Sequence, residues 1–117
     1  MNSPRSLSEI ERAELASAFS DVINYGGDDP LAPIDPLAYR SPEGDSCLHI
    51  AAIRGDLRAV QLLVAAGLDV NERGDMGYTT LHYARTPEVV EFLLQNGADP
   101  GIKNEFGRCP VGWSAEK

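Results

Sequence analysis

Apolar residues recur at helical spacing in one segment, and capping residues mark the start of a second, so we expect a helix in each. In the first, four apolar side chains fall at i, i+3, i+6 and i+7: Leu57, Val60, Leu63 and Val64. Asp56 precedes this run as an N-cap, and Gly67 follows it as a left-handed stop. The second segment begins with Thr86-Pro87-Glu88, which is the order of a cap, a first-turn proline and a first-turn acid.

A third amphipathic helix is predicted over residues 6–27. Ser6 or Ser8 with Glu9 or Glu11 is typical of a capping box, and the pair Gly26-Gly27 ends the pattern. The apolar face of this helix is made of Ile10, Leu15, Phe19, Val22 and Ile23. The proline-rich residues 28–43 are incompatible with a helix and predict a loop.

The central part of the chain contains an internal sequence repeat of two copies. Gly44 aligns with Gly77, and the Leu48-His49 pair aligns with Leu81-His82, each 33 residues further on. The later halves of the two copies align 30 residues apart, so the second copy lacks three residues. A third copy starts at Gly107. Self-similarity at this period predicts a stack of repeated units.

The pattern G-x-[TS]-x-L-H-x-A, a Gly break and then V-x-L-L-x-x-x-G-A-D resembles the ankyrin repeat over about residues 39 to 115. The resemblance implies an all-α solenoid, in which each unit is a β-turn finger followed by two antiparallel helices. We expect a single domain over 1–117 with the following parts: N-terminal capping helix 6–27, Pro-rich loop 28–43, first full repeat 44–73, second, shortened repeat 74–103 and partial repeat 104–117.

Local residues support this layout and also mark departures from it. Ser46 and Thr80 are expected to cap the first helix of each full repeat. The first helix of the second repeat, 81–85, is expected to be barely more than one turn. Cys47 and Thr80 stand where the family usually has proline, and Gly112 stands in place of the histidine.

The charge balance bears on the partner. Ten basic residues oppose eighteen acidic ones, giving a net charge of -8. This charge disfavours nucleic acid and anionic membranes and favours a basic protein. No apolar stretch is long enough for a membrane span, and acids interrupt the N-terminal segment where a signal peptide needs an apolar core. A cytoplasmic location is therefore expected.

Candidate chemistry is sparse. His49 and His82 occupy the Leu-His position of the repeat, where the resemblance implies structural hydrogen bonds around the finger. Cys47 and Cys109 lie two repeats apart, too far to form a disulfide. We therefore expect no enzyme, no cofactor and no metal. The alternative from another class is a metal-dependent enzyme that uses His49, His82, Asp45 and the cysteines.

The resemblance places a binding surface on the concave face, made of finger tips and first helices. The positions there that the fold does not fix are Glu43, Asp45, Ile50, Ile53, Arg54, Asp75, Met76, Tyr78, Tyr83, Arg85, Glu105, Phe106, Arg108 and Trp113. Aromatic residues and arginine are enriched at binding hot spots. Phe106 and Trp113 have a second interpretation, in which they seal the C-terminal end of the stack.

These observations predict a protein that is a monomer on its own and binds another protein. Small ankyrin proteins that resemble this one include bacterial immunity proteins, which implies a cognate toxin as one candidate partner. A toxin that acts on nucleic acid presents a basic site, which an acidic surface can occupy. The alternative within the same class is a regulatory adaptor or scaffold for a cytosolic enzyme.

Overall fold

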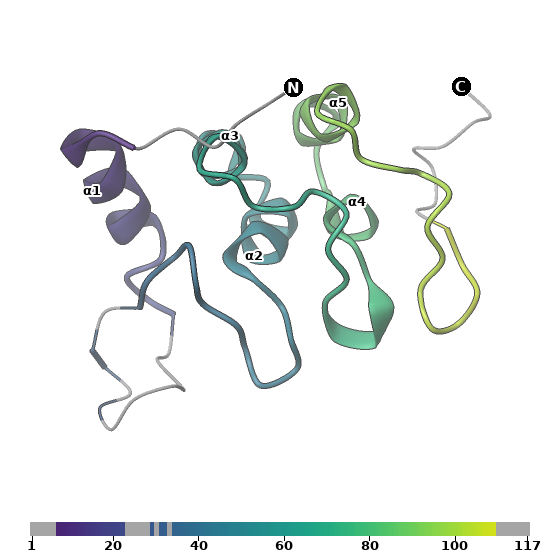
Figure 1. Ribbon diagram of the computed structural model, residues 1–117, viewed down its shortest axis with the longest axis horizontal. Helices are drawn as coiled ribbons and strands as arrows, with labels where there is room; N and C mark the ends of the chain where they lie inside the picture. Colours follow the sequence, from purple (N-terminus) through teal and green to yellow (C-terminus); the bar gives the residue numbers. More distant parts are fainter. Residues whose placement is uncertain (1–6, 23–28, 30, 33, 110–117) are drawn as a thin grey trace.

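The computed structural model describes residues 7–22, 29, 31–32 and 34–109, and this part of the chain contains helices and no strand. The elements in chain order are α1 (Glu9–Ala18), α2 (Cys47–Arg54), α3 (Leu57–Ala65), the 3-10 turn η1 (Asp75–Gly77), α4 (Thr80–Tyr83) and α5 (Pro87–Gln95). Helices α1, α3 and α5 form an outer row, α2 and α4 form an inner row, and hairpin loops project from the inner side (Figure 1). The expected all-α class is confirmed.

Each repeat is a helical hairpin whose turn is set by its capping residues. Helix α2 ends at Gly55, which adopts a left-handed conformation with φ 72°. The Asp56 side chain then caps α3 by accepting a hydrogen bond from the Ala59 backbone at 3.1 Å. In the second repeat, Thr86 caps α5 and Pro87 occupies its first turn. These caps are the ones that the sequence predicts.

The core lies between the two rows of helices. Its largest fully buried aliphatic side chains come from all four helices of the two repeats: Leu48, Val60, Leu62, Leu63, Leu81, Val89 and Leu93. Ala51 and Ala52 are also buried, so the small side chains of α2 allow close packing against α3 and α4. The apolar stripe predicted for α3 thus faces the core, with Leu57 and Val64 packed at its margin.

Helix α1 is shorter than the predicted span of 6–27. Its capping box is confirmed at Ser8 and Glu11, but the helix ends when Phe19 leaves the helical conformation and turns its ring into the core. Leu15 is buried as expected, whereas Ile10 is 76% exposed and does not belong to the packed face. Since α1 packs beside α3, it covers the first full repeat in the outer row. Ser6, Ile23, Gly26 and Gly27 lie outside the described residues.

The cap of α4 also differs from the prediction. Thr79 occupies the N-cap position, and Thr80 is the first helical residue. Thr80 is fully buried, and its hydroxyl donates to the Val70 carbonyl at 2.8 Å. Its side chain therefore holds the preceding loop against α4 and does not cap the helix. Helix α4 has four residues, which confirms that the shortened repeat retains little more than one helical turn.

The loop before the first repeat contains two copies of Asp-Pro-Leu-Ala, at 29–32 and 35–38. In both copies the Asp side chain accepts a hydrogen bond from the Leu backbone, at 2.9 Å for Leu31 and 3.0 Å for Leu37. Leu37 packs against the core, whereas Leu31 is exposed. In the described residues this segment consists of turns, in agreement with the predicted loop.

Candidate protein-binding surface

Three equivalent hairpins project from the inner side of the stack. We name them finger 1 (41–45), finger 2 (74–78) and finger 3 (104–108). Each is closed by a backbone hydrogen bond from its first residue to its last, 2.9, 2.7 and 2.9 Å long respectively. The fourth residue of each is a glycine with positive φ: Gly44 (102°), Gly77 (77°) and Gly107 (80°). The repeated glycines that mark the sequence pattern are therefore the residues that permit this turn.

Neighbouring fingers are joined near their tips. The Asp45 carboxylate of finger 1 accepts a hydrogen bond from the Asp75 backbone at 2.9 Å. The Glu105 backbone of finger 3 donates to the Met76 carbonyl at 2.9 Å. A Cβ added at Gly77 would lie 3.0 Å from the Glu105 nitrogen. Fingers 2 and 3 are thus in direct contact, and the three tips form a continuous row.

The two histidines support the fingers from beneath. The backbone N–H of Ser46 donates to His49 Nδ1 at 3.0 Å, so Nδ1 is an acceptor and Nε2 carries the proton. His49 Nε2 then donates to the Glu72 carbonyl at 3.0 Å. His82 repeats the arrangement between the Thr79 backbone and the Arg108 carbonyl, at 3.0 and 2.9 Å. Burial lowers the pKa of His49, against an opposing effect of the Asp45 carboxylate.

These contacts occupy both nitrogens of each imidazole, in line with the structural role that was expected. Within the described residues, His, Cys, Asp and Glu side chains form no group of three or more that could hold a metal ion. Cys47 is a buried free thiol whose pKa burial raises to about 12, so it is a poor nucleophile. Cys109 is also free, and the described residues therefore give no support to the metal-enzyme alternative.

The finger tips carry exposed apolar side chains. Met76 and Phe106 occupy equivalent positions on fingers 2 and 3, and their side chains are 50% and 62% exposed. Glu43 holds the same position on finger 1 and is exposed. Asp75 and Glu105 directly precede the apolar residues, so carboxylates border the apolar pair. Met76 has φ 57°, an unfavourable conformation for a residue with a side chain.

An aromatic cluster lies behind the tips, between the fingers and α4. Tyr78 stacks on Tyr83 with ring centroids 5.4 Å apart, and Tyr83 contacts His49 edge-on at 5.6 Å. The Tyr83 hydroxyl donates to Asp45 Oδ1 at 3.3 Å. Burial, the Asp45 charge and this hydrogen bond raise the pKa of Tyr83. Both tyrosines are half-buried, so Tyr78 can contact a partner while Tyr83 also joins two repeats.

The other predicted surface residues do not all lie together. Ile50 packs against the core, and Ile53 is just exposed on α2. Arg54 is directed toward α1, where its guanidinium binds the Ala18 carbonyl and Asp21, each at 2.9 Å. Arg85 and Arg108 are exposed. Trp113 lies outside the described residues.

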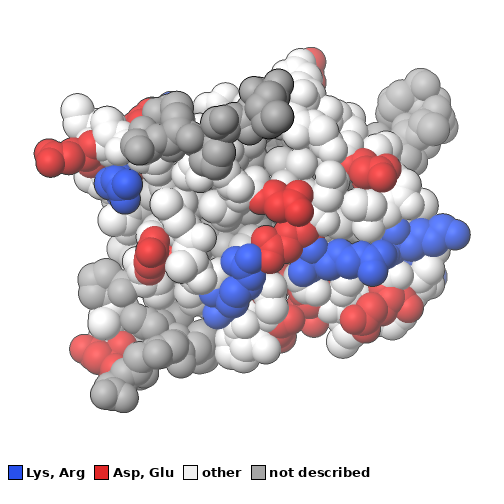
Figure 2. Space-filling view, in the orientation of Figure 1, with Lys and Arg blue, Asp and Glu red and all other residues white. Residues whose placement is uncertain are grey.

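Basic residues that the sequence reasoning missed are interspersed with the acids. Arg40 forms an ion pair with Glu72, and the Arg73 guanidinium donates to the Lys103 carbonyl at 2.5 Å. Figure 2 shows acidic and basic side chains adjoining one another near the middle of this face. The charge behind the fingers is therefore mixed, whereas each finger tip carries a carboxylate.

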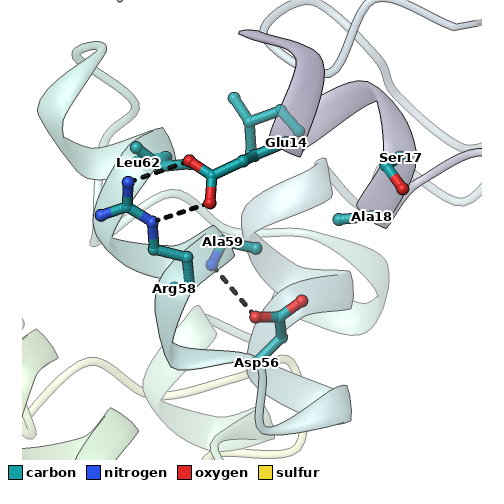
Figure 3. A pocket seen from close by; sticks show the side chains of 8 residues that line it. Glu14, Ser17, Ala18, Asp56, Arg58, Ala59 and Leu62 are labelled. Carbon is teal, nitrogen blue, oxygen red and sulfur yellow. Dashed lines mark hydrogen bonds and ion pairs between the residues drawn. The ribbon is translucent and has the colours of Figure 1, made fainter. Parts of the chain in front are cut away.

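A shallow groove of about 330 Å³ lies between α1 and α3. Arg58 and Glu14 face each other across it as an ion pair at 2.9 Å, and Asp56 lies below as the cap of α3 (Figure 3). The groove is lined by small residues such as Ser17, Ala18 and Ala59. The ion pair and the cap account for the charged groups of the groove as parts of the seam between two helices.

Stacked helical hairpins joined by a row of fingers define a helical-repeat binding protein. A family model of ankyrin repeats in three copies matches residues 22–113. The chain belongs to the ankyrin-repeat family, whose repeats are protein–protein interaction modules. None of the helices in the described part of the chain has the length and hydropathy needed to span a membrane.

Curated relatives agree with this assignment. The chain is 38% identical over 77 residues to protein phosphatase 1 regulatory subunit 27 of Homo sapiens, an alignment that covers 63% of this chain and 50% of the relative. It is 46% identical over 68 residues to ankyrin repeat domain-containing protein 40 of Mus musculus, covering 55% of this chain and 19% of the relative. The chain thus spans half the length of the first relative and about a fifth of the second.

Proposed function

We propose that the chain binds a protein partner through its fingertip surface, which we define as Glu43, Asp75, Met76, Tyr78, Glu105 and Phe106. The observation that carries the proposal is the pair Met76 and Phe106, which are exposed at the tips of two fingers that touch. Large apolar side chains exposed to solvent on two neighbouring fingers favour a partner that covers them. Such a role requires no catalytic group.

The charge of the tips supports a basic partner. Glu43, Asp75 and Glu105 provide a carboxylate on each finger, and the whole chain carries a net charge of -8. Opposite charge on the partner would accelerate the encounter and orient the complex. The bases behind the fingers are partly engaged within the chain, as in the Arg40–Glu72 pair.

Among binding roles we propose a regulatory adaptor. The similarity to a phosphatase regulatory subunit supports a protein that holds or regulates an enzyme. The second candidate is an immunity protein that blocks a cognate toxin, and the acidic finger tips and overall charge support it. The identity of a captured partner separates the two, because a housekeeping enzyme favours the adaptor and a secreted toxin favours immunity.

Affinity capture with matched variants tests the proposal. The wild-type chain, Met76→Gly and Phe106→Ala serve as baits, and Leu94→Ala is the control, because Leu94 is a partly exposed apolar residue of α5 in the outer row. We expect a protein that wild type and Leu94→Ala retain and that both finger variants lose. Equal retention by all four baits would show that the finger tips do not bind it.

A further inference from the structure

Resting on the proposed function, we propose that the partner segment that crosses the fingertip surface is an extended peptide. It carries a basic residue over finger 1 and a bulky apolar residue over fingers 2 and 3, about four positions apart. The proposal follows from three features of the tips: the position of the apolar pair, the position of the charges and the spacing of the fingers.

The apolar site lies between Met76 and Phe106. The hydrogen bond from the Glu105 backbone to the Met76 carbonyl, 2.9 Å long, holds fingers 2 and 3 together directly beside both side chains. Because both side chains are at least half exposed, a partner side chain that inserts between them removes apolar surface on both from water. Methionine adapts its shape to the inserted group, which suits leucine, methionine or phenylalanine.

The basic site lies over Glu43. This residue occupies on finger 1 the position that Met76 and Phe106 occupy on the other fingers, and it is exposed. The neighbouring carboxylate of Asp45 already accepts hydrogen bonds from the Asp75 backbone and the Tyr83 hydroxyl. We therefore assign the ion pair with the partner to Glu43.

Arg108 fixes the order of the two sites along the row. It is an exposed base on finger 3, two positions beyond Phe106. A basic partner residue over finger 3 would meet Arg108 as well as the Glu105 carboxylate, so the two charges there oppose each other, whereas over finger 1 it meets Glu43. Arg40 does not cancel this attraction, since it forms an ion pair with Glu72.

The spacing of the fingers sets the distance between the two partner residues. Helices of neighbouring repeats pack about 8–10 Å apart, so adjacent fingers are separated by about the same distance. The distance from finger 1 to the midpoint between fingers 2 and 3 is one and a half times this separation, or about 12–15 Å. An extended chain advances about 3.3 Å per residue, so this distance corresponds to about four residues.

The test is selection from a random twelve-residue peptide library displayed on phage, with the full chain immobilised. The wild type should enrich peptides with Lys or Arg about four positions from Leu, Met or Phe. Glu43→Lys should enrich an acid in place of the base while keeping the apolar residue. Phe106→Ala should lose the apolar preference, and Leu94→Ala should select the same peptides as wild type.

Measured affinities sharpen the result. For a peptide selected on wild type, Glu43→Lys should weaken binding about fivefold, as expected for an exposed ion pair. Phe106→Ala should weaken it about tenfold or more. Selected peptides without the paired residues, selections that Glu43→Lys leaves unchanged, or no enrichment at all would each overturn this inference. The proposed function would still stand if capture of a folded protein depended on Met76 and Phe106.

Discussion

The Oδ1 atom of Asp45 lies 2.9 Å from the backbone nitrogen of Asp75 and accepts its hydrogen bond, so a side chain of one finger anchors the backbone of the next. Gly74 allows this approach, since a Cβ at Gly74 would lie 2.2 Å from the same oxygen and 3.1 Å from His49 Nε2. The seam between the first two repeats therefore depends on a residue without a side chain.

Gly74→Ala should lower the free energy of unfolding by about 1–3 kcal/mol, the usual effect of overpacking. The added methyl must displace the Asp45 carboxylate and break its bond to Asp75. In an Asp45→Ala background the same Gly74→Ala change should cost less, because the closest atom is gone. Urea unfolding of the wild type, the two single variants and the double variant measures this coupling. Additive effects would mean that the two residues do not meet as described.

Met76→Gly should leave the fold at least as stable as wild type. Met76 has φ 57°, and glycine adopts this conformation without the penalty of about 1 kcal/mol that other residues incur. Its matched counterpart is Gly77→Ala, which should be destabilising, because Gly77 has φ 77° and little space beside Glu105. Thermal unfolding followed by circular dichroism measures both. A Met76→Gly protein that melts well below wild type would contradict the assigned backbone conformation.

Arg54→Ala should weaken the docking of α1 rather than partner binding. Its guanidinium binds the Ala18 carbonyl and Asp21, and it lies 5.8 Å from the centroid of the Phe19 ring. We expect a loss of about 1–2 kcal/mol, the sum of exposed polar contacts and a cation–π contact. Compared with wild type, the backbone amides of α1 should exchange hydrogen faster, whereas those of α5 should change less.

The control for this change is Arg85→Ala, because Arg85 is an exposed arginine in the loop after α4, and its removal should change stability by less than about 0.5 kcal/mol. If Arg54→Ala instead abolished capture of a partner while α1 stayed protected, Arg54 would belong to the binding surface, as its position in the repeat predicts.

Mild acid should destabilise the protein through His49. Burial lowers the pKa of this histidine in the folded state, so below its ordinary pKa near 6.5 the unfolded chain binds the proton more readily. Its contribution to stability is complete above about pH 6.5 and declines as the pH falls, by no more than about 1.4 kcal/mol per pH unit.

Urea unfolding between pH 7.5 and 5.5 measures this effect in a range above the titration of most carboxylates. His49→Gln should be less stable than wild type at pH 7.5, since it disturbs the bonds to Ser46 and Glu72. It should also show a flatter dependence on pH. An equally steep dependence in the variant would assign the effect to other groups.

The sequence was sufficient to predict the stack because its strongest signals are local. Gly55 ends α2 through its left-handed backbone, and Asp56 begins α3 through its side chain. Neither effect depends on contacts with distant parts of the chain. The sequence repeat then identifies equivalent positions in distant segments, and this requires no information about tertiary contacts. Leu63 and Leu93 could therefore be placed in the core from spacing alone.

The finer assignments required tertiary contacts. Tyr83 occupies a surface position of the repeat, but its ring packs on His49 and its hydroxyl reaches Asp45 from the previous repeat. Arg54 likewise occupies a surface position until α1 covers it. The predicted α1 was too long because the apolar spacing continues past Phe19, whereas the backbone leaves the helical conformation at Phe19 and the helix ends there.

The four-residue helix α4 has a consequence for how this chain tolerates change. The shortening of the second repeat does not extend beyond Thr86. The Thr86 hydroxyl caps α5 by accepting a hydrogen bond from the Val89 backbone at 3.3 Å. We therefore expect an insertion or deletion between His82 and Thr86 to stay within one unit, with finger 3 keeping its position beside finger 2. The segment between α4 and α5 is therefore the place in this scaffold where a change in chain length should disturb the neighbouring repeats least.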